Sequence, residues 1–74
     1  MTRVIITEHA RKRLKEMRQQ DISIADIVSA ARSIPGTIVA ATRFRGFTAR
    51  SGRVFDMVVK DIPTGRLVIT IIGK

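Results

Sequence analysis

Cysteine, tryptophan and tyrosine are absent from this 74-residue sequence, and histidine occurs once. Without cysteine the chain can form neither a disulfide bond nor a thiolate metal site. One histidine and six acidic residues offer few other ligands, so we expect no metal ion and no cofactor. A length of 74 residues also excludes a dinucleotide-binding fold.

Long apolar runs are missing as well. The first apolar run holds three residues, Val4–Ile6, and ends at Thr7 and Glu8. It is shorter than the apolar segment of a signal peptide and far shorter than a membrane span. We therefore expect a cytoplasmic protein without a membrane partner.

Acidic residues are scarce relative to basic ones: 6 Asp and Glu stand against 14 Lys and Arg, a formal net charge of +8. Ten of the fourteen cations are arginine, whose planar guanidinium donates two parallel hydrogen bonds to a phosphate. Such an excess attracts polyanions, and it is typical of nucleic-acid-binding domains. We expect RNA as the partner. The alternative is a charged surface that serves solubility, or one typical of a thermophile.

The first helix is predicted after a short β-like run at Arg3–Ile6. Thr7 can cap this helix by accepting a hydrogen bond from a free backbone N–H, and the helix should run from Glu8 to about Arg18. Its apolar stripe has helical spacing and consists of Ala10, Leu14 and Met17.

The second helix is predicted from a capping box. Ser23 and Asp26 have the required spacing, with Asp in place of the usual Glu. The helix should run to about Ser33, because Pro35-Gly36 ends it. Its apolar stripe consists of Ile24, Ile27, Val28 and Ala31.

The second half of the chain is predicted to be extended. Thr37–Thr42 is rich in β-branched residues, and Arg43–Arg50 continues it up to a tight turn at Ser51-Gly52. Arg53–Lys60 and Arg66–Ile72 are the clearest strands. We therefore predict one domain, residues 1–74, of the α+β class: two N-terminal helices packed on one face of an antiparallel sheet of three to four strands.

The register of the last hairpin follows from the length of its loop. A five-residue loop, Asp61–Gly65, pairs Lys60 with Arg66 and Asp56 with Thr70. A slip of one residue would exchange the two faces. With this register, the bulkier face should lie under the helices, and it consists of Phe55, Met57, Val59, Leu67, Ile69 and Ile71.

The last strand, Leu67–Ile72, is too apolar to be an exposed sheet edge. We expect Val4–Ile6 or a second copy of the chain, in a homodimer, to lie beside it. A protein-interaction role is an open alternative, because a patch of β-branched residues would form if their face is uncovered: Val54, Val58, Val68 and Ile72.

The first candidate site lies on the first helix. His9 and Arg13 are separated by about 40° on an ideal helix, with Glu16 nearby. Lys12 borders them and is expected to contact the nucleic acid. A neutral imidazole can transfer a proton near physiological pH, and an arginine can hold a phosphate. An exposed helical histidine among ordinary ion pairs is the alternative.

The second candidate site is the segment from Arg43 to Arg53. Its arginines are good phosphate contacts: Arg43, Arg45, Arg50 and Arg53. Phe44 and Phe47 could stack on bases, or they could belong to the core. A third candidate is the polar pair of Asp56 and Thr70 among apolar strand residues, for which an ordinary cross-strand hydrogen bond is the alternative.

The segment Thr7-Glu8-His9-Ala10-Arg11-Lys12-Arg13 resembles the start of a family of small bacterial proteins of unknown function, Thr/Ser-x-His-Ala-x-x-Arg. That family is related to the barnase–EndoU–colicin–RelE group of ribonucleases and toxins. The resemblance implies metal-independent RNA cleavage with His9 as the proton-transfer group, Arg13 as a phosphate clamp and Thr70 as an orienting residue. It also implies an antitoxin protein as a partner. A nucleic-acid-binding or protein-interaction module without catalysis is the alternative.

Overall fold

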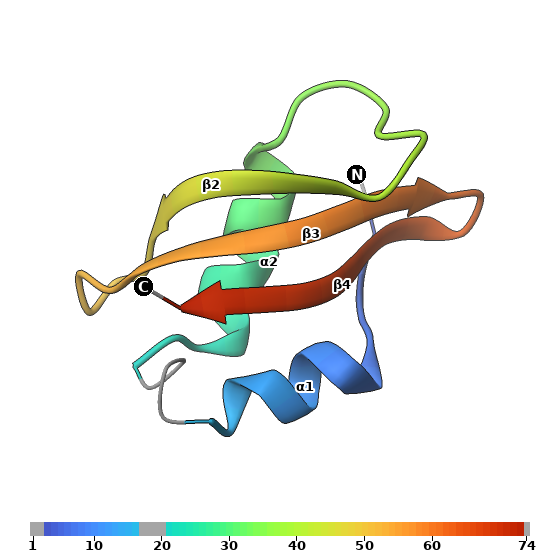
Figure 1. Ribbon diagram of the computed structural model, residues 1–74. Coiled ribbons are helices and arrows are strands. Elements are labelled where there is room, and N and C mark those ends of the chain that lie inside the picture. Colours follow the sequence, from blue (N-terminus) through green and yellow to red (C-terminus); the bar gives the residue numbers. More distant parts are fainter. Residues whose placement is uncertain (1–2, 17–20, 74) are drawn as a thin grey trace.

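The computed structural model describes residues 3–16 and 21–73 of the chain. Two helices and four strands form an α+β domain, which confirms the predicted class (Figure 1). In chain order the elements are β1 (Val4–Ile6), α1 (Glu8–Leu14), α2 (Ile24–Ser33), β2 (Thr42–Thr48), β3 (Val54–Ile62) and β4 (Gly65–Gly73). In Figure 1, α2 lies behind the strands and α1 lies below them.

The sheet is mixed, with the strand order β1-β4-β3-β2. β2 and β4 are antiparallel to β3, but β1 is parallel to β4, so the prediction of an antiparallel sheet is wrong at this edge. Parallel neighbours require a long crossover connection, and between these two strands the chain forms both helices and the other strands. Of the two neighbours expected for the last strand, Val4–Ile6 or a second copy of the chain, Val4–Ile6 lies beside it.

The cap of α1 also fastens the helix to the sheet. The Thr7 hydroxyl accepts the backbone N–H of Ala10 at 3.1 Å and donates to the carbonyl of Ile69 in β4 at 2.9 Å. The predicted N-cap is therefore confirmed. The helix ends at Leu14, earlier than predicted, and tightens there because the N–H of Lys15 bonds a carbonyl three residues back. The predicted continuation through residues 17 and 18 lies outside the described residues.

The capping box of α2 is formed as predicted. The Ser23 hydroxyl accepts the N–H of Asp26 at 3.1 Å, and the Asp26 carboxylate accepts the N–H of Ser23 at 2.9 Å. Ile27 and Ala31 are buried on this helix, whereas Ile24 is 42% exposed. The helix ends at Ser33, directly before Ile34 and Pro35.

The hairpin of β3 and β4 is tighter than predicted. β3 continues to Ile62 and β4 begins at Gly65, so Pro63 and Thr64 alone form the connection. Lys60 pairs with Leu67 instead of Arg66. The expected loop of five residues is therefore wrong, and so is the register built on it.

A β-bulge shifts the register of this hairpin a second time. Val59 pairs with Val68, but Val58 pairs with Thr70, which leaves Ile69 as an extra residue on β4. Asp56 consequently lies opposite Ile72, so the expected pairing of Asp56 with Thr70 is wrong.

The short turn and the bulge together decide which residues of β4 are buried. Phe55, Met57 and Val59 are fully buried, as predicted, and so is Ile71. Leu67 and Ile69 are only half-buried, and Val68 is the buried residue between them. The short turn places Val68 opposite Val59, so Leu67 and Ile69 are the wrong part of the predicted face. The extra residue then returns Ile71 to the buried face, opposite Met57.

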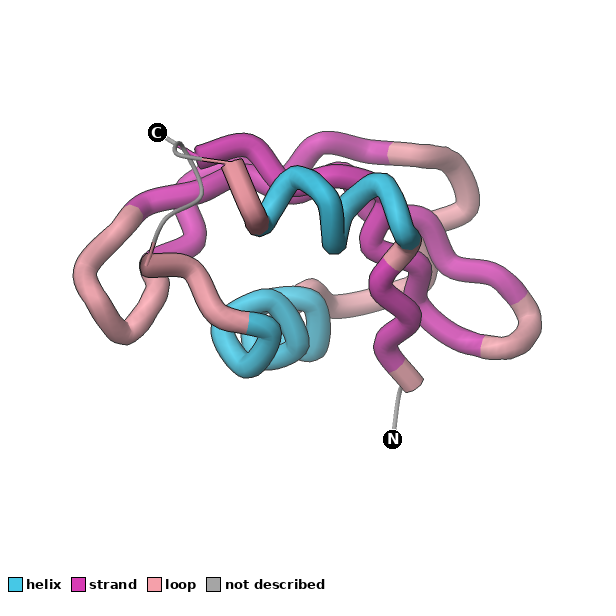
Figure 2. The backbone as a smooth tube through the Cα atoms, turned by 90° about the horizontal axis from the view of Figure 1, so that it is seen from below, coloured by secondary structure: helices cyan, strands magenta, loops and turns pink. Residues whose placement is uncertain are grey.

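One hydrophobic core joins the helices and the sheet. Ala10 of α1 and Ile27 and Ala31 of α2 belong to the same cluster of buried side chains as Phe55 and Met57 of β3. Figure 2 shows the two helices and the strands around this core from below. The cluster holds the ends of β2 and β3 in fixed positions relative to α2, which matters for the surfaces described below.

The segment predicted as a strand at Thr37–Thr42 is mostly loop, and β2 begins at Thr42. Single hydrogen bonds, instead of a strand ladder, hold the backbone of this loop. The N–H of Ile38 donates to the Asp61 carboxylate at 2.8 Å, and the carbonyl of Ile38 accepts the N–H of Asp61 at 2.7 Å. These two bonds attach the loop to the end of β3.

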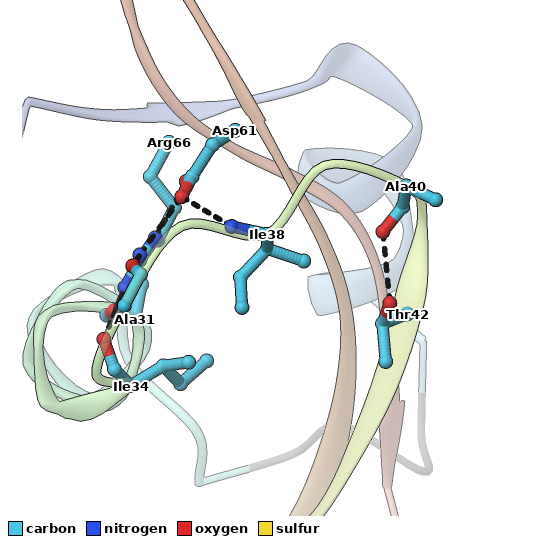
Figure 3. A network of polar contacts seen from close by, with 8 residues as sticks. Ala31, Ile34, Ile38, Ala40, Thr42, Asp61 and Arg66 are labelled. Atoms are coloured by element: carbon cyan, nitrogen blue, oxygen red, sulfur yellow. Dashed lines mark hydrogen bonds and ion pairs between the residues drawn. The ribbon is translucent and has the colours of Figure 1, made fainter.

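Arg66 carries a buried positive charge, with 3% of its surface exposed. Its guanidinium donates at 2.7 and 3.0 Å to the two oxygens of Asp61 (Figure 3). The other donors bind the carbonyls of Ala31, Ile34 and Gly36 at 2.6–2.8 Å. All five N–H groups therefore have acceptors, and a positive charge lies at the C-terminus of α2, where the helix dipole favours it.

Asp61 stays ionised in this network. The hydrogen bonds from the Arg66 guanidinium and from the N–H of Ile38 lower the pKa of Asp61 to about 2. The pair therefore keeps opposite charges at all but strongly acidic pH, and it ties α2, the following loop and the last hairpin together.

Candidate nucleic-acid interface

Four arginines lie along one edge of the sheet, on the strand β2 and the turn that follows it. Arg43, Arg45 and Arg50 are exposed, and Arg53 is half-buried. We call these four residues the arginine edge. β2 is the last strand of the sheet, and residues 43–53 include no acidic residue. The turn predicted at Ser51-Gly52 is present, since the N–H of Gly52 bonds the carbonyl of Ala49 at 2.9 Å.

A buried carboxylate shapes the arginine edge. Asp56 is fully buried, and one of its oxygens accepts the Nε and Nη2 groups of Arg43 at 3.1 and 2.8 Å. Its other oxygen accepts the N–H of Gly46 at 3.1 Å. At this point Arg45 and Gly46 form a β-bulge, and Gly46 has a φ of +80°, which favours glycine. Asp56 therefore holds both the bulge and Arg43, whose side chain is still 41% exposed.

Phe44 and Phe47 are half-buried and pack against the hydrophobic core. The rings of Phe47 and Phe55 lie 5.7 Å apart between centroids, at a tilt of 34°. This is the core placement that the sequence left open for both residues. Phe47 has a second environment, however, because it also lines a cleft.

A cleft of about 260 Å³ lies between α2 and the segment formed by β2 and its turn. Its lining residues are Asp26, Ser29, Ala30, Ser33, Phe47, Thr48 and Arg50. The backbone N–H of Arg50 donates to the Asp26 carboxylate at 3.1 Å and so attaches the turn to the helix. The N–H groups of Ser23 and Arg50 lower the pKa of Asp26, so this residue brings a negative charge to the cleft.

Sequence reasoning missed this cleft because its two walls are distant in the chain. One signal was present: Asp26, Ser29 and Ser33 follow one another at helical spacing on the polar flank of α2. The strand that faces them could not be identified without knowing the position of the turn after β2.

The residues of the first candidate site lie on and just after α1, the helix that contacts β4. His9 and Lys12 are exposed. Arg13 is half-buried, and it donates through Nε to the carbonyl of Ile71 at 3.3 Å and through Nη1 to Glu16 at 3.0 Å. The α1 helix is therefore fastened to β4 on both sides of residue 70, at the carbonyls of residues 69 and 71.

Thr70 lies on the face of the sheet opposite to Ile71. Its pair with Val58 is next to the fully buried pair of Met57 and Ile71, and adjacent residues on a strand point to opposite faces. Arg43 pairs with Val58 from the other side, so Thr70 and Arg43 share this face. Neither His9 nor Thr70 lines the cleft between α2 and β2 or the second cleft, which lies beside Pro63 and Thr64.

The two basic groups therefore occupy separate places. The group on α1 lies beside β4, whereas the arginine edge lies on β2, two strands away. A second cleft, of about 380 Å³, lies beside the turn at Pro63 and Thr64 and includes Arg3 and Asp61 in its wall. It contains no residue of either group.

Comparisons of this chain with protein-family models, with curated proteins and with solved structures found no match. Among residues 3–16 and 21–73, no helix combines the length and the apolar character that crossing a membrane requires.

Proposed function

We propose that this protein binds RNA in the cytoplasm through the arginine edge. The observation that carries the proposal is the grouping of four arginines on an edge strand and its turn, with no acidic residue among residues 43–53. On α1, by comparison, Glu8 and Glu16 lie among the cations. Asp56 pairs with Arg43, so Arg45, Arg50 and Arg53 carry most of the positive charge that the arginine edge offers. Phosphate contacts supply most of the affinity of such interfaces.

The fold supports this proposal by leaving the arginines accessible. We infer that both helices cover the same face of the sheet, because side chains from both enter the cluster around Phe55 and Met57. Arg43 lies on the other face, and Arg45 and Arg50 are exposed at the edge. Asp56 limits the freedom of Arg43, which reduces the conformational entropy that binding would cost.

Binding of a single-stranded RNA oligonucleotide should weaken steeply with salt. Each phosphate contact made by an arginine contributes about 0.7 to the slope of log K against log salt for a single strand. Three to four contacts at the arginine edge therefore predict a slope of about −2 to −3. Fluorescence anisotropy with labelled RNA between about 50 and 300 mM KCl measures it. Affinity independent of salt, or no binding at the lowest salt, contradicts the proposal.

A metal-independent ribonuclease is the second candidate function. It is supported by the attachment of α1, which carries His9 and Arg13, to β4. Thr70 lies on the opposite face of the sheet, so this candidate rests on His9 and Arg13 alone. In this reaction the RNA 2′-hydroxyl attacks the adjacent phosphate, and His9 transfers the proton. The antitoxin partner and the homodimer stay predictions.

If the ribonuclease hypothesis holds, purified protein cleaves RNA in EDTA, and His9→Ala reduces the rate by 100-fold or more. Arg11→Ala, another exposed residue of α1, is the matched control. Equal cleavage by the parent and by His9→Ala removes His9 from the mechanism. RNA that is bound but stays intact leaves the binding function alone.

A further inference from the structure

We propose that the cleft between α2 and β2 holds one unpaired nucleobase of the RNA, and that it prefers a base with an amino group. This inference rests on the proposed RNA binding. It adds a site that reads a base to an interface that otherwise contacts phosphates.

The size and the apolar wall of the cleft suit a single base. Its volume of about 260 Å³ is below the roughly 300–1,000 Å³ of pockets that enclose drug-sized molecules. Phe47 and Ala30 supply the apolar part of the lining. The Phe47 ring is held in place by Phe55 on β3. A fixed aromatic ring next to a phosphate-binding surface is the arrangement that stacks bases of single strands.

The polar wall of the cleft is rich in hydrogen-bond acceptors. The Asp26 carboxylate is ionised, because the N–H groups of Ser23 and Arg50 lower its pKa. It accepts three hydrogen bonds, from the N–H and the hydroxyl of Ser23 and from the N–H of Arg50, and a carboxylate has about four acceptor positions. The Ser33 hydroxyl donates its hydrogen to the carbonyl of Ala30 at 2.6 Å, so it offers lone pairs to the cleft. Ser29 and Thr48 add hydroxyls that can donate or accept.

This wall discriminates between bases. Adenine, cytosine and guanine carry an amino group, and a carboxylate can accept a hydrogen bond from it. Uracil has no amino group, and its one N–H donor, at N3, lies between two carbonyl oxygens that a carboxylate repels. A strand that contains adenine or cytosine should therefore bind better than a strand of uracil alone.

The cleft is continuous with the arginine edge. Arg50 belongs to both, and its backbone N–H donates to Asp26 at 3.1 Å. The turn that carries this arginine is thereby fixed against the helix that carries the acceptors. A base in the cleft leaves its own phosphate next to Arg50, and Arg45 follows on β2.

The test uses an oligouridine of about eight nucleotides with one central 2-aminopurine. The protein has no tryptophan or tyrosine, so the emission comes from the probe. Stacking on Phe47 should quench the probe on binding. Oligo-A and oligo-C should compete about tenfold better than oligo-U, the size that one stacked and hydrogen-bonded base provides.

Ser29→Leu is the variant that blocks the cleft. Ser29 is exposed on α2, and leucine is the better helix former, so the fold should be kept. Ala25→Leu, one helical turn away and outside the cleft lining, is the matched control, and thermal unfolding followed by circular dichroism verifies all variants. We expect Ser29→Leu to abolish the quenching and the base preference but to keep the salt slope, with Ala25→Leu unchanged.

Three results overturn the inference. Quenching and base preference that persist in Ser29→Leu show that the base lies elsewhere, while RNA binding stands. Enhanced emission on binding shows that the probe is unstacked and not held on Phe47. Absence of binding by any oligonucleotide at low salt removes the proposed function itself, and with it the cleft as a base site.

Discussion

Replacing Arg66 by methionine is expected to lower the free energy of unfolding by about 3–5 kcal/mol, the cost of removing one partner from a buried ion pair. Methionine fills a similar volume but donates no hydrogen bond. The Asp61 carboxylate would lose its charged partner, and the carbonyls of Ala31, Ile34 and Gly36 would lose theirs. A chain of 74 residues has a total stability of about 4–11 kcal/mol, so the loss removes at least about a quarter of it.

Urea unfolding followed by far-ultraviolet circular dichroism measures this loss. Arg11→Met is the matched control, because Arg11 is exposed on α1 and its replacement should change stability by less than about 0.5 kcal/mol. Arg66→Lys keeps the charge but cannot reproduce the fork of five donors, so it should fall between the two. A loss below about 1 kcal/mol for Arg66→Met would contradict the role assigned to this residue.

Replacing Arg45 and Arg50 together by glutamine should weaken RNA binding about 25-fold at about 0.1 M salt. The estimate follows from a slope of about 0.7 per phosphate contact, which amounts to about fivefold for each contact at this salt concentration. The slope of log K against log salt should fall by about 1.4. Both side chains are exposed, so the fold should tolerate the change. Arg43 is left in place because it neutralises the buried Asp56.

The matched control removes the same charge from the other basic group. Arg11→Gln with Lys15→Gln takes two exposed cations from α1 and lowers the net charge equally. If RNA contacts the arginine edge, this control should weaken binding by no more than about threefold. Equal losses in the two double variants would show that binding follows the net charge of the protein instead of the surface of β2.

Local signals in the sequence predicted the helix caps and the fold class. Thr7, Ser23 and Asp26 act on backbone groups within three residues of themselves, so their function is readable from spacing. Val4–Ile6 was also one of the two predicted neighbours of the last strand, because an apolar edge must be covered.

The register of the last hairpin and the burial of Arg66 were not predictable in this way. The bulge at Ile69 has no local mark such as glycine, and it reverses the burial of β4 from that point. Arg66 is buried because acceptors from residues 31, 34, 36 and 61 converge on it. Such a set exists only after α2 and the hairpin have packed together.

In the candidate site, too, one part could be predicted from the sequence and another could not. The arginine edge was visible as a run of charges in the sequence. The anchoring of Arg43 by Asp56, and the cleft beside Phe47, depend on the bulge at Gly46 and on the bond between Arg50 and Asp26. Both link residues at least ten positions apart, beyond the range of any spacing rule.

The most direct test of the account is a titration of ¹⁵N-labelled protein with a short single-stranded RNA at low salt, followed by backbone amide shifts. Contact at the arginine edge predicts that the largest shifts occur at residues 42–53, with further shifts along α2 at Asp26, Ser29 and Ser33. The largest shifts at His9, Arg13 and Thr70 would contradict this account and move the RNA to α1 and β4. Absence of any shift would contradict RNA binding altogether.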